Sequence, residues 1–281
     1  MEITAATVKD LRERTGLPMM ECKQALGECK GDVKEAIEWL RKKHKGKLSE
    51  REGRATGEGW IGMYIDDSRK FGALVELQCE TAPVAKNEIF QSLANAFARK
   101  VAKGLEKCPL PNAIRQDPEL DSMFTEVFGK LREAMNLTQC RRVEGGYVAA
   151  YVHHDGKSGV MLALDKKPTS DKNVAQDLCM HALFTNPAGI SRNDVPADQV
   201  EKVRKEAREA ATAEGKPAGV LDKIAEGKVN AFYAERVLLE QLHVKTDDYG
   251  KAKVGDVLKA AGVTAVTDLA IMKVGGATES R

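Results

Sequence analysis

The 281 residues carry a formal net charge of +2, with 42% hydrophobic and 31% charged residues. This balance is typical of a soluble globular protein of two or three compact units, and it excludes a disordered or fibrous chain. Because the net charge is so small, no field over the whole molecule would draw it to nucleic acid or an anionic membrane. We therefore expect no direct nucleic-acid partner and no membrane partner.

The cysteines are scattered along the chain and form no CxxC pair. This spacing indicates reduced thiols rather than a disulfide framework or a zinc site. The chain does not open with a basic start and an apolar run, and no stretch approaches the ~20 apolar residues of a membrane span. We expect a cytoplasmic protein that holds no metal and no cofactor.

Three short helices are predicted over residues 1–42. The first starts at Ala5 behind Thr4, which is placed to cap it. Pro18 opens the second helix, MMECKQALGE, and Asp32 can cap the third, VKEAIEWLRKK. Apolar residues recur at helical spacing in the third. The segment predicts a small three-helix bundle, near the lower size limit for independent folding.

A polar, basic stretch, RKKHKGKLSEREGR, follows the bundle. Its charge is compatible with a nucleic-acid arm, but no aromatic side chains are interleaved among the charges. We therefore interpret residues 43–56 as a solvated, flexible linker.

The middle of the chain repeats itself. Residues 59–77, GWIGMYIDDSRKFGALVEL, can be laid over residues 146–164, GYVAAYVHHDGKSGVMLAL. Each copy is a strand, a polar turn and a second strand, and each is followed by a helical pattern. The repeat predicts an α+β fold with two related subdomains, each packing a helix on an antiparallel sheet. We place them at 57–145 and at 146–195 together with 243–281.

Residues 196–242 predict an antiparallel helical hairpin that protrudes from the second subdomain. The seam of its first helix is formed by Val200, Val203, Ala207 and Ala210, and a break at Gly215 precedes the second helix. Two core helices are the alternative, but the charge on the other faces favours exposure. Whether the hairpin also joins two copies of the chain in a homodimer is left open. A short helix at GDVLKAAG and a last strand at TDLAIMKVG return to the core.

One cluster, His153-His154-Asp155, resembles a metal or acid–base site. Adjacent residues on a strand point to opposite faces, so the two histidines should not share one metal, and Asp155-Gly156 is ordinary turn chemistry. Phosphate-cradling, metalloprotease and hydrolase motifs are missing from the sequence. The sequence therefore predicts a binding protein and not an enzyme.

The string TVKDLRERTGLPMMECKQALGECKGDVKEAIEWLR closely resembles the N-terminal module of the elongation factor Ts family. The resemblance continues through LVELQCETAPVAKN, the YVHHDG turn, MHAL and GKPAGVLDKIAEGKVNAFYAE, and it covers nearly the whole chain in the family's order. The chain is identified as a member of this family. The resemblance implies a bundle of the ubiquitin-associated (UBA) type, two core subdomains and a helical hairpin.

The resemblance implies a factor that promotes exchange of GDP for GTP on elongation factor Tu during protein biosynthesis. Such a factor binds the GDP-bound and the nucleotide-free partner. If it weakens the partner's binding of GDP, GDP must weaken the partner's binding of the factor. By position, Arg12, Met19 and Met20 would contact the partner's nucleotide domain, and His153 would belong to a second contact from the core. Simple bundle packing is the alternative for the two methionines. Because adjacent helical residues cannot both face one small core, at least one should face outward.

The chain departs from the family at the bend between a strand and a helix. The family usually has Thr-Asp-Phe-Val there, the segment held to displace the partner's magnesium, and this chain has Thr81, Ala82, Pro83 and Val84. Pro83 suits a first helical turn, and Thr81 can cap the helix one residue earlier. The first hypothesis is a working exchange factor whose bend acts differently. The alternative is a scaffold protein that binds elongation factor Tu but exchanges nucleotide weakly.

Overall fold

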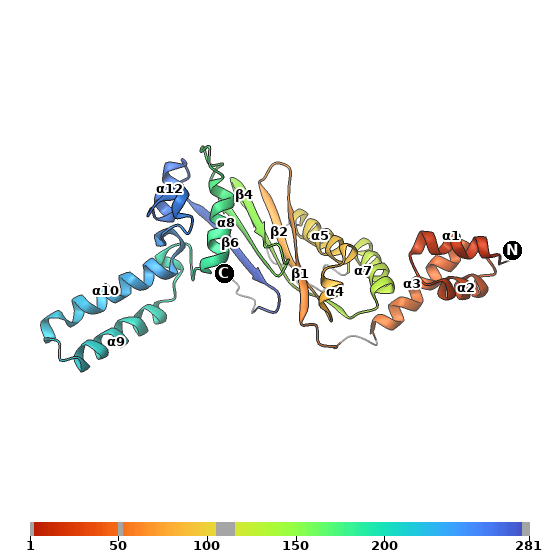
Figure 1. Ribbon diagram of the computed structural model, residues 1–281, viewed down its shortest axis with the longest axis horizontal. Coiled ribbons are helices and arrows are strands. Elements are labelled where there is room, and N and C mark those ends of the chain that lie inside the picture. The colour runs from red at the N-terminus through yellow and green to blue at the C-terminus, as the bar shows by residue number, and fades with distance from the viewer. Residues whose placement is uncertain (1–2, 50–52, 105–115, 277–281) are drawn as a thin grey trace.

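The computed structural model describes residues 3–49, 53–104 and 116–276. Figure 1 shows an N-terminal helical bundle at one end, a core of two antiparallel sheets in the middle, and a long helical hairpin at the other end. This is the α+β fold that the sequence predicts. The predictions that fall on residues 1–2, 50–52, 105–115 and 277–281, with Cys108 among them, lie outside the described residues.

The bundle consists of α1 (Ala5–Thr15), α2 (Met19–Glu28) and α3 (Val33–Ser49). Both predicted caps are confirmed: the Thr4 side chain accepts from the Thr7 amide, and the Asp32 carboxylate accepts from the Glu35 amide at 2.9 Å. The bundle has a small apolar core of its own, formed by Val8, Leu11, Leu17, Cys22, Ala25, Leu26, Ala36 and Leu40.

The predicted linker at 43–56 is wrong over its first half, because α3 continues without a break to Ser49. His44 is only 5% exposed, and an added Cβ at Gly129 of α7 (Pro118–Leu131) would lie 2.3 Å from its ring. Lys45 also forms an ion pair with Asp121 of α7 at 2.8 Å. Contact with α7 therefore keeps this charged segment helical and anchors the bundle to the core.

The first sheet has the strand order β1–β2–β3 and is antiparallel throughout. Its strands are β1 (Glu58–Ile65), β2 (Phe71–Cys79) and β3 (Met135–Glu144). The helices α4 (Ala82–Ala85), α5 (Glu88–Lys103) and α7 cover its outer face over a core that contains Phe90, Phe97 and Phe124. The helix predicted after β2 is broken, because the Asn87 side chain caps α5 by accepting from the Ile89 amide at 2.9 Å.

The second sheet repeats this plan with the order β4–β5–β6. Its strands are β4 (Tyr147–Val152), β5 (Ser158–Leu164) and β6 (Val266–Lys273). The outer face is covered by α8 (Val174–Thr185) and α12 (Val254–Ala260), and three short turns complete the subdomain: η1 (Arg192–Asp194), η2 (Leu238–Glu240) and α11 (Thr246–Tyr249). Both predicted hairpins are confirmed, with Trp60 opposite Leu77 in the first and Tyr151 opposite Val160 in the second.

The inner faces of the two sheets pack on each other, so the core has four layers of helix, sheet, sheet and helix (Figure 1). Apolar side chains from both sheets, including Ile61, Leu74 and Met161, are fully buried between them. The turn of the second hairpin is part of this contact: the Ile61 amide donates to the Gly156 carbonyl at 2.8 Å. Gly156 has a φ of +70°, and a Cβ there would lie 1.9 Å from the Trp60 ring, so only glycine fits.

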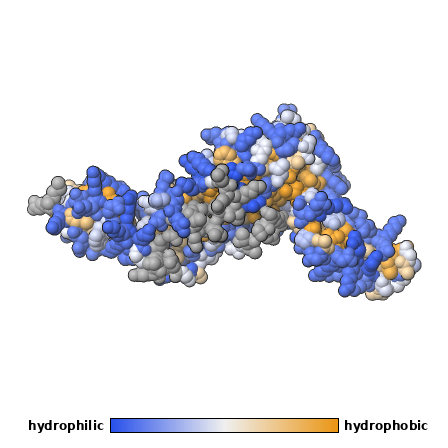
Figure 2. All heavy atoms as spheres, turned by 180° about the vertical axis from the view of Figure 1, so that it is seen from behind, coloured by the Kyte–Doolittle hydropathy of each residue, from blue (hydrophilic) through white to orange (hydrophobic). Residues whose placement is uncertain are grey.

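The hairpin consists of α9 (Ala197–Ala213) and α10 (Ala218–Arg236). Val200 is buried and Val203 and Ala207 are half-buried, as predicted, but the last seam residue is Ala211 and not Ala210, which is exposed. Val200 and Ala211 are 11 residues apart, which is three turns of a straight α-helix with about 3.6 residues per turn. A strict seven-residue repeat would need the helix to supercoil. On the face that Figure 2 shows, the bundle and the hairpin are covered mainly by hydrophilic side chains.

Candidate partner-binding surfaces

The bend lies where β2 ends and α4 begins. Thr81 has extended backbone (φ −131°, ψ 152°) at the N-cap position, and Ala82 is the first helical residue. Pro83 is exposed, whereas Val84 is half-buried against the core beneath. The bend thus presents a small apolar tip, and the predicted position of Thr81 as the cap is confirmed. Its hydroxyl, however, accepts no capping hydrogen bond from the helix and instead donates to the carboxylate of Glu133 at 2.6 Å.

Two carboxylates tie this bend to the turn between α7 and β3. Glu133 accepts from the Thr81 amide at 3.0 Å as well as from its hydroxyl. In return, Glu80 accepts from the Ala134 amide at 2.7 Å. No local sequence pattern predicts this pairing, since 52 residues separate Glu133 from Thr81.

Cys79 lies directly beneath the bend and is fully buried. Its thiol donates to the Thr81 carbonyl at 3.3 Å. Burial, with help from the nearby Glu133 charge, raises the pKa of the Cys79 thiol to about 12. The thiol therefore stays protonated near neutral pH and is a poor nucleophile. Cys179 is likewise fully buried in the second subdomain.

The N-terminal bundle carries a second candidate surface at the start of α2. Met19 is 42% exposed and Met20 is 72% exposed, so core packing does not account for either side chain. Arg12 on α1 is also exposed. The expectation that at least one methionine faces outward is confirmed. Exposed methionines adapt their shape to a partner surface, which suits a protein contact.

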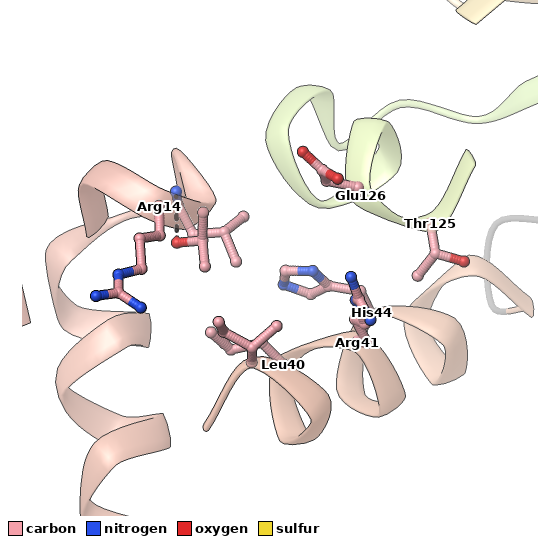
Figure 3. Close-up of a pocket in the computed structure, with 9 residues that line it drawn as sticks. Arg14, Leu40, Arg41, His44, Thr125 and Glu126 are labelled. Carbon is pink, nitrogen blue, oxygen red and sulfur yellow. Dashed lines mark hydrogen bonds between the residues drawn. The ribbon is translucent and has the colours of Figure 1, made fainter. Parts of the chain in front are cut away.

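The bundle is joined to the core by a short polar network around Glu21. One carboxylate oxygen of Glu21 lies 3.1 Å from His44 Nε2, and the other accepts from Arg132 at 2.6 Å. Burial acts to raise the pKa of Glu21, but the His44 hydrogen bond and the Arg132 charge outweigh it and lower the pKa. Figure 3 shows His44 on α3 beside Thr125 and Glu126 of α7, at a cavity of about 150 Å³.

The third predicted site, His153, lies in the turn after β4. The expectation that His153 and His154 point apart is wrong: their ring centroids are 4.2 Å apart, because both follow the last strand residue, Val152. His153 Nδ1 also lies 3.1 Å from the Tyr151 hydroxyl. Within residues 3–49, 53–104 and 116–276, no group of three or more His, Cys, Asp and Glu side chains is arranged to hold a metal.

The bend and the His153 turn lie at the same end of the core. Glu58, at the start of β1, is the register partner of Cys79 just before the bend. The Glu58 carboxylate also forms an ion pair at 2.7 Å with Lys157, in the second hairpin's turn. The structure therefore brings together two predicted site segments that are about seventy residues apart in sequence, while Met19 and Met20 lie on the separate bundle.

A buried polar network supports the base of the hairpin. The rings of His181 and His243 stack with centroids 5.1 Å apart, and both side chains are at most 2% exposed. His181 Nδ1 accepts from the Val244 amide at 3.2 Å, so Nε2 carries the proton that Gln241 accepts at 2.9 Å. Burial, followed by the neighbouring His181, lowers the pKa of His243 to about 4.

Asp177 faces the same network from α8. Its carboxylate accepts from Lys245 at 2.5 Å and from the Tyr249 hydroxyl at 2.7 Å. Although burial acts in the opposite direction, these two hydrogen bonds lower the pKa of Asp177. The network joins α8, the end of the hairpin and α11, and periodicity in the sequence did not point to it.

In the described part of the chain, no helix is both long and apolar enough to cross a membrane.

Comparison with known proteins places the chain in a family. The family model described as elongation factor TS matches residues 80–276. The elongation factor Ts of Azoarcus sp. strain BH72 is 41% identical over 269 residues, which cover 94% of this chain and 88% of that protein. The elongation factor Ts of Clostridium botulinum strain ATCC 19397 is 38% identical over 88% of this chain and 83% of its own length. The elongation factor Ts of Aquifex aeolicus is 36% identical over 94% of both chains. The chain therefore belongs to the elongation factor Ts family and has the role of a translation elongation factor Ts in protein biosynthesis.

Proposed function

We propose that this chain binds elongation factor Tu carrying GDP and promotes the replacement of that GDP by GTP, without itself catalysing a chemical reaction. Family membership over most of the chain is the observation that carries this proposal. The exposed apolar side chains and the bend described above supply surfaces for a protein partner. Such a function needs neither a bound metal nor a cofactor on this chain.

Three contacts share the work in this proposal. Arg12, Met19 and Met20 dock on the partner's nucleotide-binding domain, where the exposure of both methionines provides apolar area. His153 belongs to a second contact made by the core. The bend from Thr81 to Val84 faces the partner's magnesium side. The common position of the bend and the His153 turn at one end of the core supports their use against one partner.

The bend acts in this proposal as a small, stiff wedge. Pro83 fixes its own backbone near the helical φ and presents an exposed ring, and Ala82 adds little bulk beside it. The wedge replaces the acid and the aromatic ring that the family usually has at these positions. The contact it makes with the partner must therefore be apolar and small. The scaffold alternative, with weak exchange, is not favoured by relatives that are all elongation factor Ts.

Binding linkage gives a direct test. If this chain weakens the binding of GDP to elongation factor Tu, GDP must weaken the binding of this chain to elongation factor Tu by the same factor. Titration calorimetry should therefore find tight binding to nucleotide-free elongation factor Tu and much weaker binding to the GDP-loaded form. Equal affinities for the two forms would contradict an exchange function.

A further inference from the structure

We infer that Glu133 is a positioning residue that holds the bend in its working place, and that the N-terminal bundle braces it through Arg132. This inference rests on the proposed function for its effect on exchange. The contacts themselves belong to this chain alone. Glu133 itself lies in the turn behind the bend, so it acts on the partner only through Thr81.

The bend depends on Glu133 for its hydrogen bonds. The Thr81 amide and hydroxyl both donate to one carboxylate, at 3.0 and 2.6 Å, in a paired geometry. Hydrogen bonds to an ionised carboxylate are stronger than those between neutral groups. Because α4 is only four residues long, it cannot hold its own N-terminus in place. An external carboxylate therefore defines where the helix begins.

Hydrogen bonds run in both directions between the bend and the turn that contains Glu133, so the bend is held stiffly. Glu80 on the bend side accepts from the Ala134 amide at 2.7 Å, one residue beyond Glu133. Each turn thus supplies a carboxylate that accepts a hydrogen bond from a backbone amide of the other turn. Neither turn can move away without breaking charge-assisted hydrogen bonds at both ends. A stiff wedge displaces a partner's groups more effectively than a mobile one, since less of the binding energy is spent on ordering it.

Arg132 connects the turn that contains Glu133 to the N-terminal bundle. It adopts a left-handed conformation, with a φ of +58°, at the end of α7. This conformation is uncommon for a residue with a side chain. Its guanidinium donates to Glu21 of α2 at 2.6 Å, and Glu21 also contacts His44. The bundle that bears Met19 and Met20 is therefore linked through Glu21, Arg132 and Glu133 to the bend.

The test uses the full-length chain and compares Glu133→Ala and Glu133→Gln with a control, Glu119→Ala. The control alters an exposed glutamate on the first turn of α7, the helix that precedes the Glu133 turn. Glutamine can still accept one bond but carries no charge. Hydrogen–deuterium exchange of the peptide 79–87 is measured on the free protein. Stopped-flow release of labelled GDP from elongation factor Tu gives the maximal rate and the half-saturating concentration.

We expect Glu133→Ala to speed amide exchange in 79–87 by at least about tenfold, the factor for losing even one of the two Thr81 hydrogen bonds to a charged group. We also expect a maximal GDP release rate about fivefold to tenfold lower, by the same argument, with little change in half-saturation. Glu133→Gln should fall between Ala and the wild type. Glu21→Gln should have a smaller effect that disappears in the Glu133→Ala background.

Deuterium uptake at 79–87 that stays at the wild-type level in Glu133→Ala would overturn the inference. So would faster uptake throughout the first subdomain, which indicates a general structural role, or a higher half-saturation with an unchanged maximal rate. The deuterium measurement needs no partner. If the wild-type chain fails to release GDP, the proposed function fails, while this measurement still decides whether Glu133 holds the bend.

Discussion

A methyl group added at Gly129 tests whether the N-terminal bundle is docked on the core. Gly129 lies in the last turn of α7, and a Cβ there would lie 2.3 Å from Nδ1 and 2.7 Å from Cε1 of His44. These distances are far shorter than any stable contact, so the imidazole must move. A matched control is Gly227 in the interior of α10, where, apart from its chain neighbours and the adjacent backbone of its own helix, no atom of the described residues lies within 4 Å of an added Cβ.

The two substitutions should change the free energy of local opening in opposite directions. Alanine is favoured over glycine in a helix by ~1 kcal/mol, so Gly227→Ala should raise the free energy of opening of α10 by about that amount. Gly129→Ala gains the same preference of alanine for a helix. It also forces a methyl group into a packed contact, which typically costs ~1–3 kcal/mol. The displaced His44 ring also gives up its 3.1 Å contact with Glu21, worth ~1 kcal/mol. The amides of residues 42–47 in α3 should therefore exchange faster by an amount equivalent to ~1–3 kcal/mol.

Hydrogen–deuterium exchange with peptide resolution measures these opening free energies, and small-angle X-ray scattering reports whether the bundle has moved away from the core. We expect Gly129→Ala to deprotect residues 42–47 and to lengthen the particle. If Gly129→Ala instead protects its own helix as Gly227→Ala does and leaves the scattering curve unchanged, His44 is not packed against α7.

Three further outcomes are expected. Deleting residues 1–52 should weaken binding to elongation factor Tu through lost effective concentration yet leave exchange measurable at high factor concentration, and complete inactivity of a folded truncation at saturation would contradict this. Replacing Ala82 with Asp and Pro83 with Phe should raise GDP release, because an aromatic ring buries more area than proline; unchanged release on both a standard and the cognate partner would exclude the bend. The folded-state pKa of His243, about 4, lies below its ordinary 6.5, so thermal stability should be full above pH ~6.5 and decline toward pH 4. His243→Gln should flatten this decline; an equal decline in the variant would place the titration elsewhere.

The two β-hairpins were predictable because their strands alternate apolar and polar residues around polar turns. Strand β3 was not, because a bulge interrupts its alternation. Glu76 pairs with Gln139 but Leu77 pairs with Leu137, so Thr138 is an extra residue. Burial in β3 consequently passes from odd positions to even ones, and no period of two runs through the whole strand.

The candidate site was predictable only where its residues are close in sequence. The bend follows a recognisable strand, and Pro83 marks a first helical turn, so its local structure could be inferred. The contact with Glu133 depends on which turns the fold brings together, and no local pattern encodes it. His44 was missed for a related reason. A run of lysines around it indicates a solvated segment, and only α7 buries the imidazole.

Release of GDP from elongation factor Tu by this chain can be measured by stopped-flow fluorescence. Labelled GDP bound to elongation factor Tu is mixed with excess unlabelled GDP and increasing amounts of this chain. We expect the release rate to rise with the concentration of this chain and to saturate far above the spontaneous rate. A release rate that stays at the spontaneous value, while sedimentation shows that the complex has formed, would contradict the exchange function.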